Sequence, residues 1–368
     1  MFNYLVKKTE SVFILFFVLL LAISPLSLKA QDLQSTLQMM SDQAAKAYLK
    51  PASNGFGADL NSGWFSKAPK SVVLDFDVQL GLVAMGAFLP GDNKTFLING
   101  SFRFTPDQAQ LMTQSIANQY GSDAQLSLIN QLTSRDFNVQ ISGPTIIGSK
   151  NDYMKVNFYG TTLSYQPQPG QPAQDIYVPP QEIPIQEIKG VLDNMSILPF
   201  GAPQLTLGTV YGTQVLFRYL PPTEINADLG KADYFGFGIE HNIGVWVPLP
   251  LDITLGYFTQ SLKVGDIIKS RADEYGIYAS KSIGAGGAFG ITPYAGLTLQ
   301  SSTMDVSYNY LYQSQGVEVP TNISFQLKGE NSGKLVLGVA FNLSVVSLNF
   351  EYNVAKFSSI GGGLGLNF

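Results

Sequence analysis

The stretch that decides the fold is the last ten residues, Ser359-Ile360-Gly361-Gly362-Gly363-Leu364-Gly365-Leu366-Asn367-Phe368. Every second position from Ile360 to Phe368 is apolar or glycine, and the positions between them are glycine or asparagine. Side chains of a strand point alternately to opposite faces, so this pattern predicts a strand with one apolar face and one face of small, polar residues. An apolar strand at the end of a soluble protein leaves an edge that invites aggregation, whereas a closed barrel has no free edge. The stretch therefore predicts the closing strand of a barrel.

The same two-residue period recurs after residue 72. In the first segment, 72–85, one face is apolar and the other polar: Leu74, Phe76, Val78, Leu80 and Leu82 against Asp75, Asp77 and Gln79. Comparable segments are 203–209, 213–220, 233–241, 251–262, 273–284, 288–301, 334–343 and 347–354. Each is about ten residues long, the length that a tilted strand needs to cross a bilayer.

A soluble β-sandwich is the alternative to a membrane barrel. The face opposite the apolar one is rich in glycine, serine, asparagine and threonine rather than lysine and glutamate, which suits a barrel interior better than an open surface. Charged residues make up only 13% of the chain, about half the share of ordinary globular domains. The sequence therefore predicts an all-β fold, a transmembrane antiparallel up-and-down β-barrel.

The strand number depends on an insert, residues 87–202, within the predicted barrel region 72–368. Thr105 and Pro106 begin a helix as N-cap and first helical residue, and a second short helix begins at Ser122. The insert adds two or four strands, or folds into the lumen as a plug, so the total is an even number from ten to fourteen. With the C-terminus in the periplasm, residues 221–232, 263–272 and 302–333 are predicted to be outer loops.

The N-terminus predicts secretion. Lys7 and Lys8 precede an apolar run that ends near Ile23, and Ala30 is a plausible cleavage residue, so residues 1–30 are predicted to be a signal peptide. A retained membrane anchor is the alternative, but the run is shorter than the ~20 residues of a spanning helix. With the barrel pattern, this predicts the bacterial outer membrane as location and its lipid as a partner.

Residues 31–71 are predicted to form an N-terminal helical segment. Apolar residues between 31 and 50 recur at helical spacing, and Pro51 is expected to end the helix. This segment plugs the lumen, caps the periplasmic mouth or lies at the membrane interface; the sequence leaves these three placements open.

Composition excludes several kinds of function. Residues 31–368 carry 19 basic and 26 acidic side chains, so the phosphate-dominated binding of nucleic acid is not expected. The chain has no cysteine, and His241 is its only histidine, predicted on the outer face near the periplasmic rim. Because no nucleophile motif, clustered metal ligands or phosphate loop occurs, we expect no catalytic residue, no metal, no cofactor and no enzyme activity.

Several polar residues are candidates for the lumen wall by their position in the alternation: Asp75, Asp77, Gln79, Arg218 and Glu351. Arg218 either pairs with a lumen carboxylate or binds the acid head of a ligand. Trp64 is the candidate anchor of the N-terminal segment in the barrel mouth, with simple interfacial packing as the alternative.

Several short motifs carry a resemblance to a family of uncharacterised bacterial outer-membrane barrels. They are Tyr48-Leu49-Lys50-Pro51, Gly55-Phe56-Gly57, Asn61-Ser62-Gly63-Trp64, Arg218-Tyr219-Leu220-Pro221, Phe235-Gly236-Phe237-Gly238-Ile239-Glu240-His241 with Trp246 and Pro248, and the closing hairpin from Leu343 to Phe368. The chain also resembles outer-membrane barrels in ending on a phenylalanine, which implies that the barrel-assembly machinery recognises the last strand through Phe368. The plan of a small helical element before a barrel is similar to that of the long-chain fatty-acid channels.

These resemblances imply passage of a small, hydrophobic ligand. The sequence therefore favours an outer-membrane channel for small, hydrophobic molecules. The alternative is a non-transporting barrel that serves as an assembly or secretion partner.

Overall fold

The computed structural model describes residues 42–166, 171–226, 230–285, 289–314 and 317–368. The predicted signal peptide, residues 1–30, lies outside these ranges. In the described part of the chain no helix has the length and the apolar character needed to cross a membrane.

Ten antiparallel strands close into a barrel, as predicted. They are β1 (Leu74–Phe88), β8 (Ile197–Val210), β9 (Thr213–Asn226), β10 (Gly230–Asn242), β11 (Asp252–Val264), β12 (Ile268–Ser280), β14 (Phe289–Ser314), β16 (Gly333–Leu343), β17 (Val346–Val354) and β18 (Ser359–Asn367). The last strand pairs with the first over nine residues, from Gln79 opposite Asn367 to Ala87 opposite Ser359, and β12 pairs with β14 to complete the ring. The closing role predicted for residues 359–368 is confirmed.

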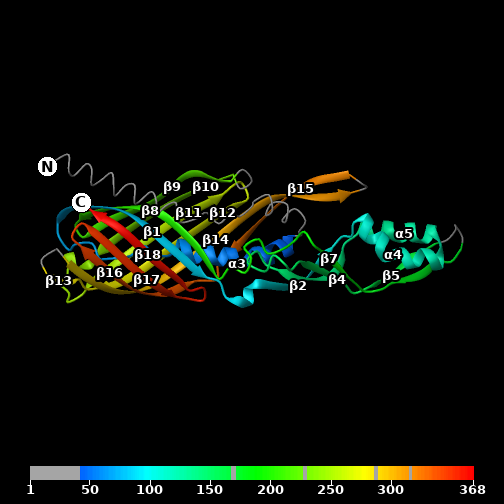
Figure 1. The fold of residues 1–368 in the computed structure, drawn as a ribbon, viewed down its shortest axis with the longest axis horizontal. Coiled ribbons are helices and arrows are strands. Elements are labelled where there is room, and N and C mark those ends of the chain that lie inside the picture. The colour runs from blue at the N-terminus through cyan, green and yellow to red at the C-terminus, as the bar shows by residue number, and fades with distance from the viewer. Residues whose placement is uncertain (1–41, 167–170, 227–229, 286–288, 315–316) are drawn as a thin grey trace.

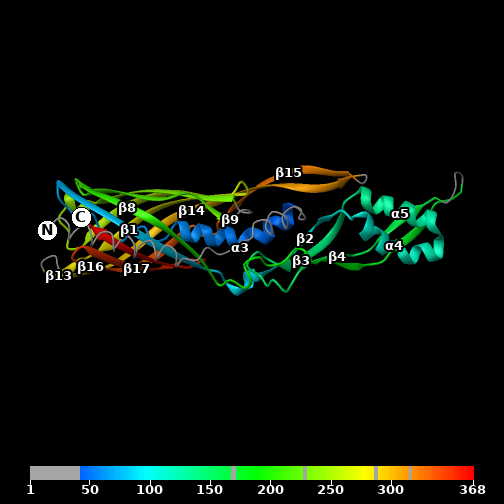
Figure 2. The same cartoon turned by 45° about the horizontal axis from the view of Figure 1, so that its top comes forward.

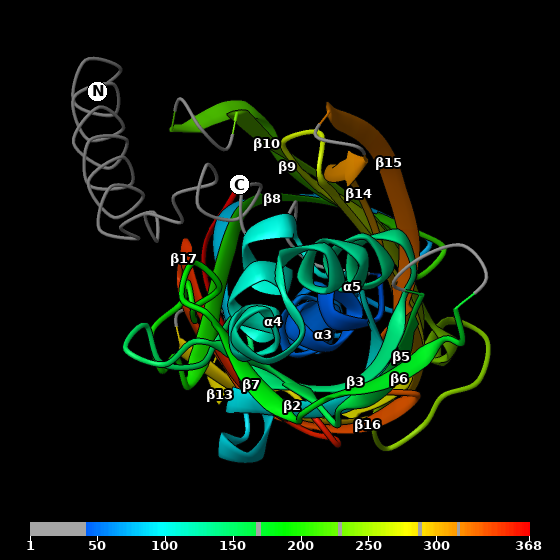
Figure 3. The ribbon, with the colours of Figure 1, turned by 90° about the vertical axis from the view of Figure 1, so that its right-hand side faces the viewer.

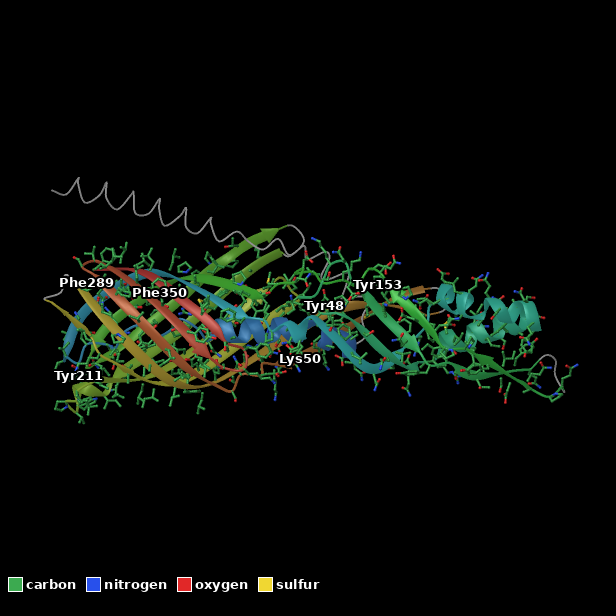
Figure 4. The ribbon with its side chains drawn as sticks, turned by 60° about the horizontal axis from the view of Figure 1, so that its bottom comes forward. Tyr48, Lys50, Tyr153, Tyr211, Phe289 and Phe350 are labelled. Atoms are coloured by element: carbon green, nitrogen blue, oxygen red, sulfur yellow. The ribbon has the colours of Figure 1, made fainter. Side chains whose placement is uncertain are left out.

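The two faces of the wall differ in chemistry as the alternation predicts. Exposed outward side chains are large and apolar, and they include Leu207, Phe235, Leu255, Ile277, Leu297, Leu299, Leu337 and Phe350. Figure 4 shows Phe350 on the barrel wall, with Phe289 and Tyr211 near one end of the barrel. The inward side chains of the same strands are buried and mostly polar or small, so the barrel presents an apolar surface to its surroundings and a polar one to its lumen.

Residues between β1 and β8 form a body beyond one end of the barrel (Figure 1). It contains a four-stranded sheet of β2 (Thr95–Phe102), β3 (Phe137–Pro144), β4 (Met154–Phe158) and β7 (Gln181–Ile185), the hairpin of β5 (Thr161–Tyr165) and β6 (Gln174–Val178), a short 3-10 turn η1 (Gly91–Lys94), and two helices, α4 (Pro106–Tyr120) and α5 (Ser122–Ser134). Among the described residues, no strand of this insert joins the barrel sheet, and the barrel has ten strands. The predicted start of α4 is confirmed, because Thr105 accepts from the backbone of Gln108 and forms a capping box with it.

We call the barrel end that carries this body the insert end, and the other end the turn end. The turn end holds the short connections 211–212 and 344–345, the 3-10 turn η2 (Ile243–Val245) and the small strand β13 (Ile283–Ala285), which pairs with β14. At the insert end, β14 continues beyond the wall and pairs with β15 (Val317–Lys328).

The outer loops predicted at 221–232, 263–272 and 302–333 are largely wrong. Most of these residues extend neighbouring strands: β9 and β10 continue to Asn226 and from Gly230, and β11 and β12 are joined by three residues only. The exposed side chains of these extensions, such as Lys263 and Arg271, are polar. The strands therefore continue to pair beyond the apolar band of the barrel.

The helix α3 (Asp42–Leu60) lies along the barrel axis (Figure 2). Its predicted end at Pro51 is wrong, because the helix continues for nine residues beyond the proline. A proline inside a helix leaves carbonyls of the preceding turn without their usual donor. The carbonyl four residues before Pro51 is that of Ala47, and the next one, of Tyr48, accepts from the backbone N–H of Ile146 in the insert (3.0 Å), which ties this turn of the helix to the insert.

Candidate functional site: the plugged lumen

The lumen is occupied by part of the chain's own segment 42–73, which we call the plug; the first turns of α3, with Ala44, Tyr48 and Leu49, pack with the insert beyond the barrel end. At the insert end of the barrel, the hydroxyl of Tyr48 donates to the carbonyl of Lys189 in the insert (2.9 Å). At the turn end, Asn242 of β10 donates to the carbonyl of Pro69 (2.7 Å), and β1 begins at Leu74. The plug therefore crosses the lumen from the insert end to the turn end, and the view along the axis places α3 inside the ring of strands (Figure 3).

Small residues let the helix fit inside a narrow barrel. A Cβ at position 57 would lie 2.2 Å from Oγ of Ser302, and a Cβ at position 55 would lie 2.9 Å from Cδ2 of Leu198. Both distances are shorter than any normal contact, so a larger residue than Gly57 or Gly55 would force the side chain of Ser302 or Leu198 to move where α3 passes β14 and β8.

Arg218 of β9 is the centre of the contacts between plug and wall. Its side chain is fully buried, 0% exposed. Its Nε donates to Oε1 of Gln204 (2.8 Å), Nη1 donates to the carbonyl of Ser62 (2.8 Å), and Nη2 donates to the carbonyl of Gly63. The guanidinium carbon lies 3.8 Å from the centroid of the Trp64 ring, a cation–π geometry. Arg218 thus holds the plug just after the helix has ended.

Trp64 lies in a recess where the wall has no side chains. A Cβ at Gly236 would lie 2.9 Å from Cη2 of Trp64, and one at Gly238 would lie 3.2 Å from Cε3. The indole N–H donates both to the carbonyl of Leu60 (3.0 Å) and to Oε1 of Gln260 (2.8 Å). The two glycines of β10 therefore provide the space for the ring, and Gln260 of β11 fixes its orientation.

Below Trp64, towards the turn end, aromatic rings fill the lumen. Phe65 stacks on Tyr278 with ring centroids 4.4 Å apart and meets the edge of Tyr294 at 5.2 Å. These tyrosines in turn cover glycines of neighbouring strands, since a Cβ at Gly296 of β14 would overlap the ring of Tyr278 on β12, and one at Gly338 of β16 would overlap the ring of Tyr294 on β14. Glycine on one strand and an aromatic ring on the next form one packed layer.

A buried ion pair contacts the plug from the other side of the lumen. Nζ of Lys334 lies 2.9 Å from Oε2 of Glu274, and their side chains are 4% and 1% exposed. Lys334 also donates to the carbonyl of Asn61, while the side chain of Asn61 accepts from Gln260 (2.7 Å). The hydroxyl of Tyr278 donates to the other oxygen of Glu274 (2.7 Å).

Glu351 of β17 completes the polar contacts. Its Oε1 accepts from the backbone N–H of Gly63 (2.6 Å) and from Nδ2 of Asn353 (2.8 Å). Next to it, the hydroxyls of Ser62 in the plug and Ser359 in β18 are 2.7 Å apart. Arg218, Lys334 and Glu351 thus each bond a backbone group of residues 61–63, so the charged groups of the wall converge on one short segment of the plug.

Two small cavities remain beside the plug. One, of about 10 Å³, lies among Ser66, Lys67, Asp77, Gln79, Thr206, Gln214 and Leu216. The other, of about 20 Å³, lies against the β1–β18 junction. Each has room for about one water molecule. At both places in the described part of the barrel, the plug and the inward side chains therefore leave no room for a larger molecule.

The structure places the predicted lumen residues as follows. Asp77 lies 3.4 Å from Nζ of Lys67 in the plug, and Gln79 donates to Ser347 (2.6 Å) and to Asn367 (2.9 Å). Arg218 and Glu351 contact the plug directly, as described above. Asp75 belongs to β1, but its side chain lies outside the description, so its lumen position stays a prediction. Trp64 lies inside the lumen rather than at the mouth.

Sequence reasoning missed Lys334, Glu274, Gln260 and the glycine recess. Lys334 and Glu274 occupy inward positions of segments whose alternation was recognised, so their position was a usable signal. The ion pair between Lys334 and Glu274, and the bond from Lys334 to the plug, could not be predicted, because the sequence does not show how the strands are arranged around the ring. His241 bonds two nearby side chains: its Nδ1 lies 2.9 Å from Oγ1 of Thr213, and Trp246 donates to its Nε2 (3.0 Å).

At the insert end, Glu330 in the loop before β16 links the plug to the loop between β17 and β18. Its carboxylate lies 2.7 Å from Nζ of Lys50 in α3 and also pairs with Lys356. These two ammonium groups lower the pKa of Glu330 to about 2.

A stability difference that depends on pH follows from this link. Because the pKa is lowered on folding, the stabilisation is fully present above the ordinary value near 4.5 and is lost as pH falls towards 2. Both lysine side chains are more than half exposed, so we expect only about 1 kcal/mol. Thermal unfolding of Glu330→Gln should begin at a lower temperature than that of the unmodified protein at pH 6, and the two should coincide at pH 2. A constant difference across this range would contradict the ion-pair explanation.

A model of the family described as "Family of unknown function (DUF6588)" matches residues 6–368. The chain belongs to this family. No curated protein matches it.

Solved outer-membrane proteins resemble the chain only distantly. The transport unit of the autotransporter AIDA-I from Escherichia coli is 7% identical, covering 88% of this chain and 97% of its own, with a TM-score of 0.25. OmpT of Vibrio cholerae lacking loop L8 is 10% identical, with coverages of 80% and 100% and a TM-score of 0.21. The toluene transporter TbuX of Ralstonia pickettii is 8% identical, with coverages of 87% and 98% and a TM-score of 0.16. At such TM-scores the barrel described above rests on its own strand pairing.

Proposed function

We propose that this protein is an outer-membrane channel for small molecules, gated by its own residues 42–73. One observation carries the proposal: Arg218, Lys334 and Glu351 of the wall bond backbone groups of residues 61–63. These contacts are polar and directed at one short segment, so a displacement of that segment breaks them together. The wall left behind is lined by polar side chains, such as Gln204, Thr206, Gln214 and Gln260, which water can wet.

A barrel of ten strands is intermediate in size between barrels filled by their own side chains and barrels with an open channel. Eight strands enclose just enough space for side chains, whereas sixteen or more leave an aqueous channel. Ten strands here accommodate one slender helix. Displacement of that helix would free a passage for one small molecule at a time.

Small hydrophobic molecules are the substrate class that we propose, on the basis of the resemblance in plan to fatty-acid channels. The aromatic layer formed by Phe65, Tyr278 and Tyr294 supports it, because a displaced plug would expose these rings to the passage. No enzyme activity, cofactor or nucleic-acid partner is part of the proposal, and recognition of Phe368 by the assembly machinery stays a prediction.

An engineered disulfide tests the gate. Ser62 and Ser359 have hydroxyls 2.7 Å apart, and the chain has no cysteine of its own, so Ser62→Cys with Ser359→Cys forms a single defined crosslink between plug and wall. We expect ion conductance in planar bilayers, and fatty-acid uptake by intact cells, to fall when the pair is oxidised and to return on reduction. The single variant Ser62→Cys, treated identically, is the control.

Two results would count against the proposal. Passage that continues unchanged in the oxidised double variant would show that residues 61–63 are not the gate. Absence of passage in both redox states would favour the non-transporting barrel, an assembly or secretion partner that presents the insert at its outer end.

A further inference from the structure

The barrel wall is not paired along its whole height. The ladder between β8 and β9 runs only from Val210 opposite Thr213 to Gln204 opposite Arg218. By contrast, β8 pairs with β1 up to Ile197, and β9 pairs with β10 up to Asn226. Residues 197–203 of β8 and 219–226 of β9 therefore have no ladder between them, and in the described part of the chain no other strand pairs with these edges. Figure 3 shows the outer ends of β9 and β10 flaring away from the ring.

We call this unpaired part of the wall the seam. Its sequence explains why it stays open. Pro199 and Pro203 lie in the unpaired half of β8, and Pro221 and Pro222 lie in that of β9. Proline has no N–H to donate to a ladder and is confined to strand edges and bulges. The β9–β10 register shifts beside Pro221 and Pro222. Prolines on both sides also disfavour the addition of a further strand, so the seam is not a site for a partner strand.

The seam has apolar side chains behind it. Leu60 of the plug, Ala202, Tyr234, Leu262 and Ala272 form a buried cluster, against which Phe56, Phe200, Leu220 and Val264 are partly buried. Phe200 and Leu220 come from the two strands that border the seam. The polar groups Gln204 and Arg218 begin only at the last paired position below it.

The seam also lies beside the surface that faces lipid. Its first unpaired residue on β9 is Tyr219, which is opposite Phe235 of β10, and both outward side chains are half exposed, at 54% and 50%. Lipid-facing aromatic residues gather at the interfaces of a bilayer. The seam thus opens where the apolar band ends on the insert side, which is the outer leaflet in the orientation predicted from the C-terminus.

We infer that the seam is a side port that binds the alkyl chain of an outer-leaflet lipid. The chain lies against Phe200 and Leu220, and the lipid's polar head meets the unpaired backbone groups of β8 and β9, which would otherwise be costly next to hydrocarbon. The seam thus offers an apolar surface to the alkyl chain and hydrogen-bonding groups to the polar head of the lipid. The inference does not depend on passage through the lumen, so it can fail or hold independently of the proposed gate.

Tryptophan quenching tests the port in the full-length protein. The chain has two tryptophans, and Trp246→Phe leaves Trp64 as the only reporter. Trp64 is 2% exposed and stacks on Arg218, whose partner Gln204 is the last paired residue below the seam. Phosphatidylcholine with brominated acyl chains quenches an indole only on close approach. In vesicles of this lipid we expect Trp64 emission to fall by roughly half relative to unbrominated lipid.

Variants separate the port from quenching through the wall. Phe200→Ser and Leu220→Ser, singly and together in the Trp246→Phe background, make the lining polar and should reduce the quenching at least twofold. Both side chains are only partly buried, so the single variants are expected to fold. Phe341→Ser is the matched control, because Phe341 lies on β16, which is paired on both sides at that position; it should leave quenching unchanged. No quenching of Trp64, or an equal reduction in Phe341→Ser, would overturn the inference.

Discussion

Replacement of Arg218 by methionine should open the barrel. The substitution leaves three acceptors, at Gln204, Ser62 and Gly63, without their donor in a buried site. Each unsatisfied group costs about 1–3 kcal/mol, so the closed state should lose at least about 3 kcal/mol. Because 1.4 kcal/mol is a factor of ten, the ratio of open to closed states should rise by roughly a hundredfold. Single-channel recording in planar bilayers should show openings far more often than in the unmodified protein.

Arg271→Met is the matched control for this experiment. The side chain of Arg271 is 50% exposed and pairs with Asp305 on the outside of β12 and β14, so the same chemical change there should leave conductance unaltered. Silent records from a folded Arg218→Met barrel would mean that the other contacts of the plug, with Lys334, Glu351 and the aromatic rings, hold it in place without Arg218, and the role assigned to Arg218 would be wrong.

Replacement of Gly236 by valine should expel Trp64 from its recess. A Cβ at this position already lies 2.9 Å from the indole, and valine adds two further methyl groups. Overpacking of this kind costs about 1–3 kcal/mol, and the displaced ring would lose its bond to Gln260 as well. We expect the Trp64 emission of Gly236→Val, measured in the Trp246→Phe background, to move to longer wavelength, and the midpoint of thermal unfolding to fall.

Gly362→Val provides the comparison for this variant. Gly362 lies on the lipid-facing side of β18, and a Cβ there would meet nothing closer than 3.5 Å. A similar loss of stability in both variants would show that the effect comes from the strand propensity of glycine and valine rather than from the space that Trp64 occupies.

The alternation of side chains predicted the barrel well because it is a local property. Each of the ten segments carries its own apolar face, and none needs information from a distant residue. The same reasoning placed Arg218 and Glu351 on the inward face. It could not show that both would bond residues 62 and 63, because that contact depends on a plug inside the lumen, and the sequence left the placement of the N-terminal segment open.

Two errors have a common physical origin. Pro51 was expected to end a helix and residues 221–232 were expected to form a loop, since proline and polar residues oppose regular structure locally. In the folded protein, Ile146 of the insert donates to the carbonyl of Tyr48 in the turn before Pro51, and β9 and β10 pair with each other past Pro221 and Pro222. Partners distant in sequence overrode the local preference in both cases.

The path of residues 42–73 through the barrel has a consequence for biogenesis. These residues precede the first strand, and their partners lie on strands spread from β1 to β18. A ring that closed before this segment entered would leave Arg218, Lys334 and Glu351 without their backbone partners in residues 61–63. We therefore expect the N-terminal segment to favour closure of the wall around it, as an internal template for the joining of β18 to β1.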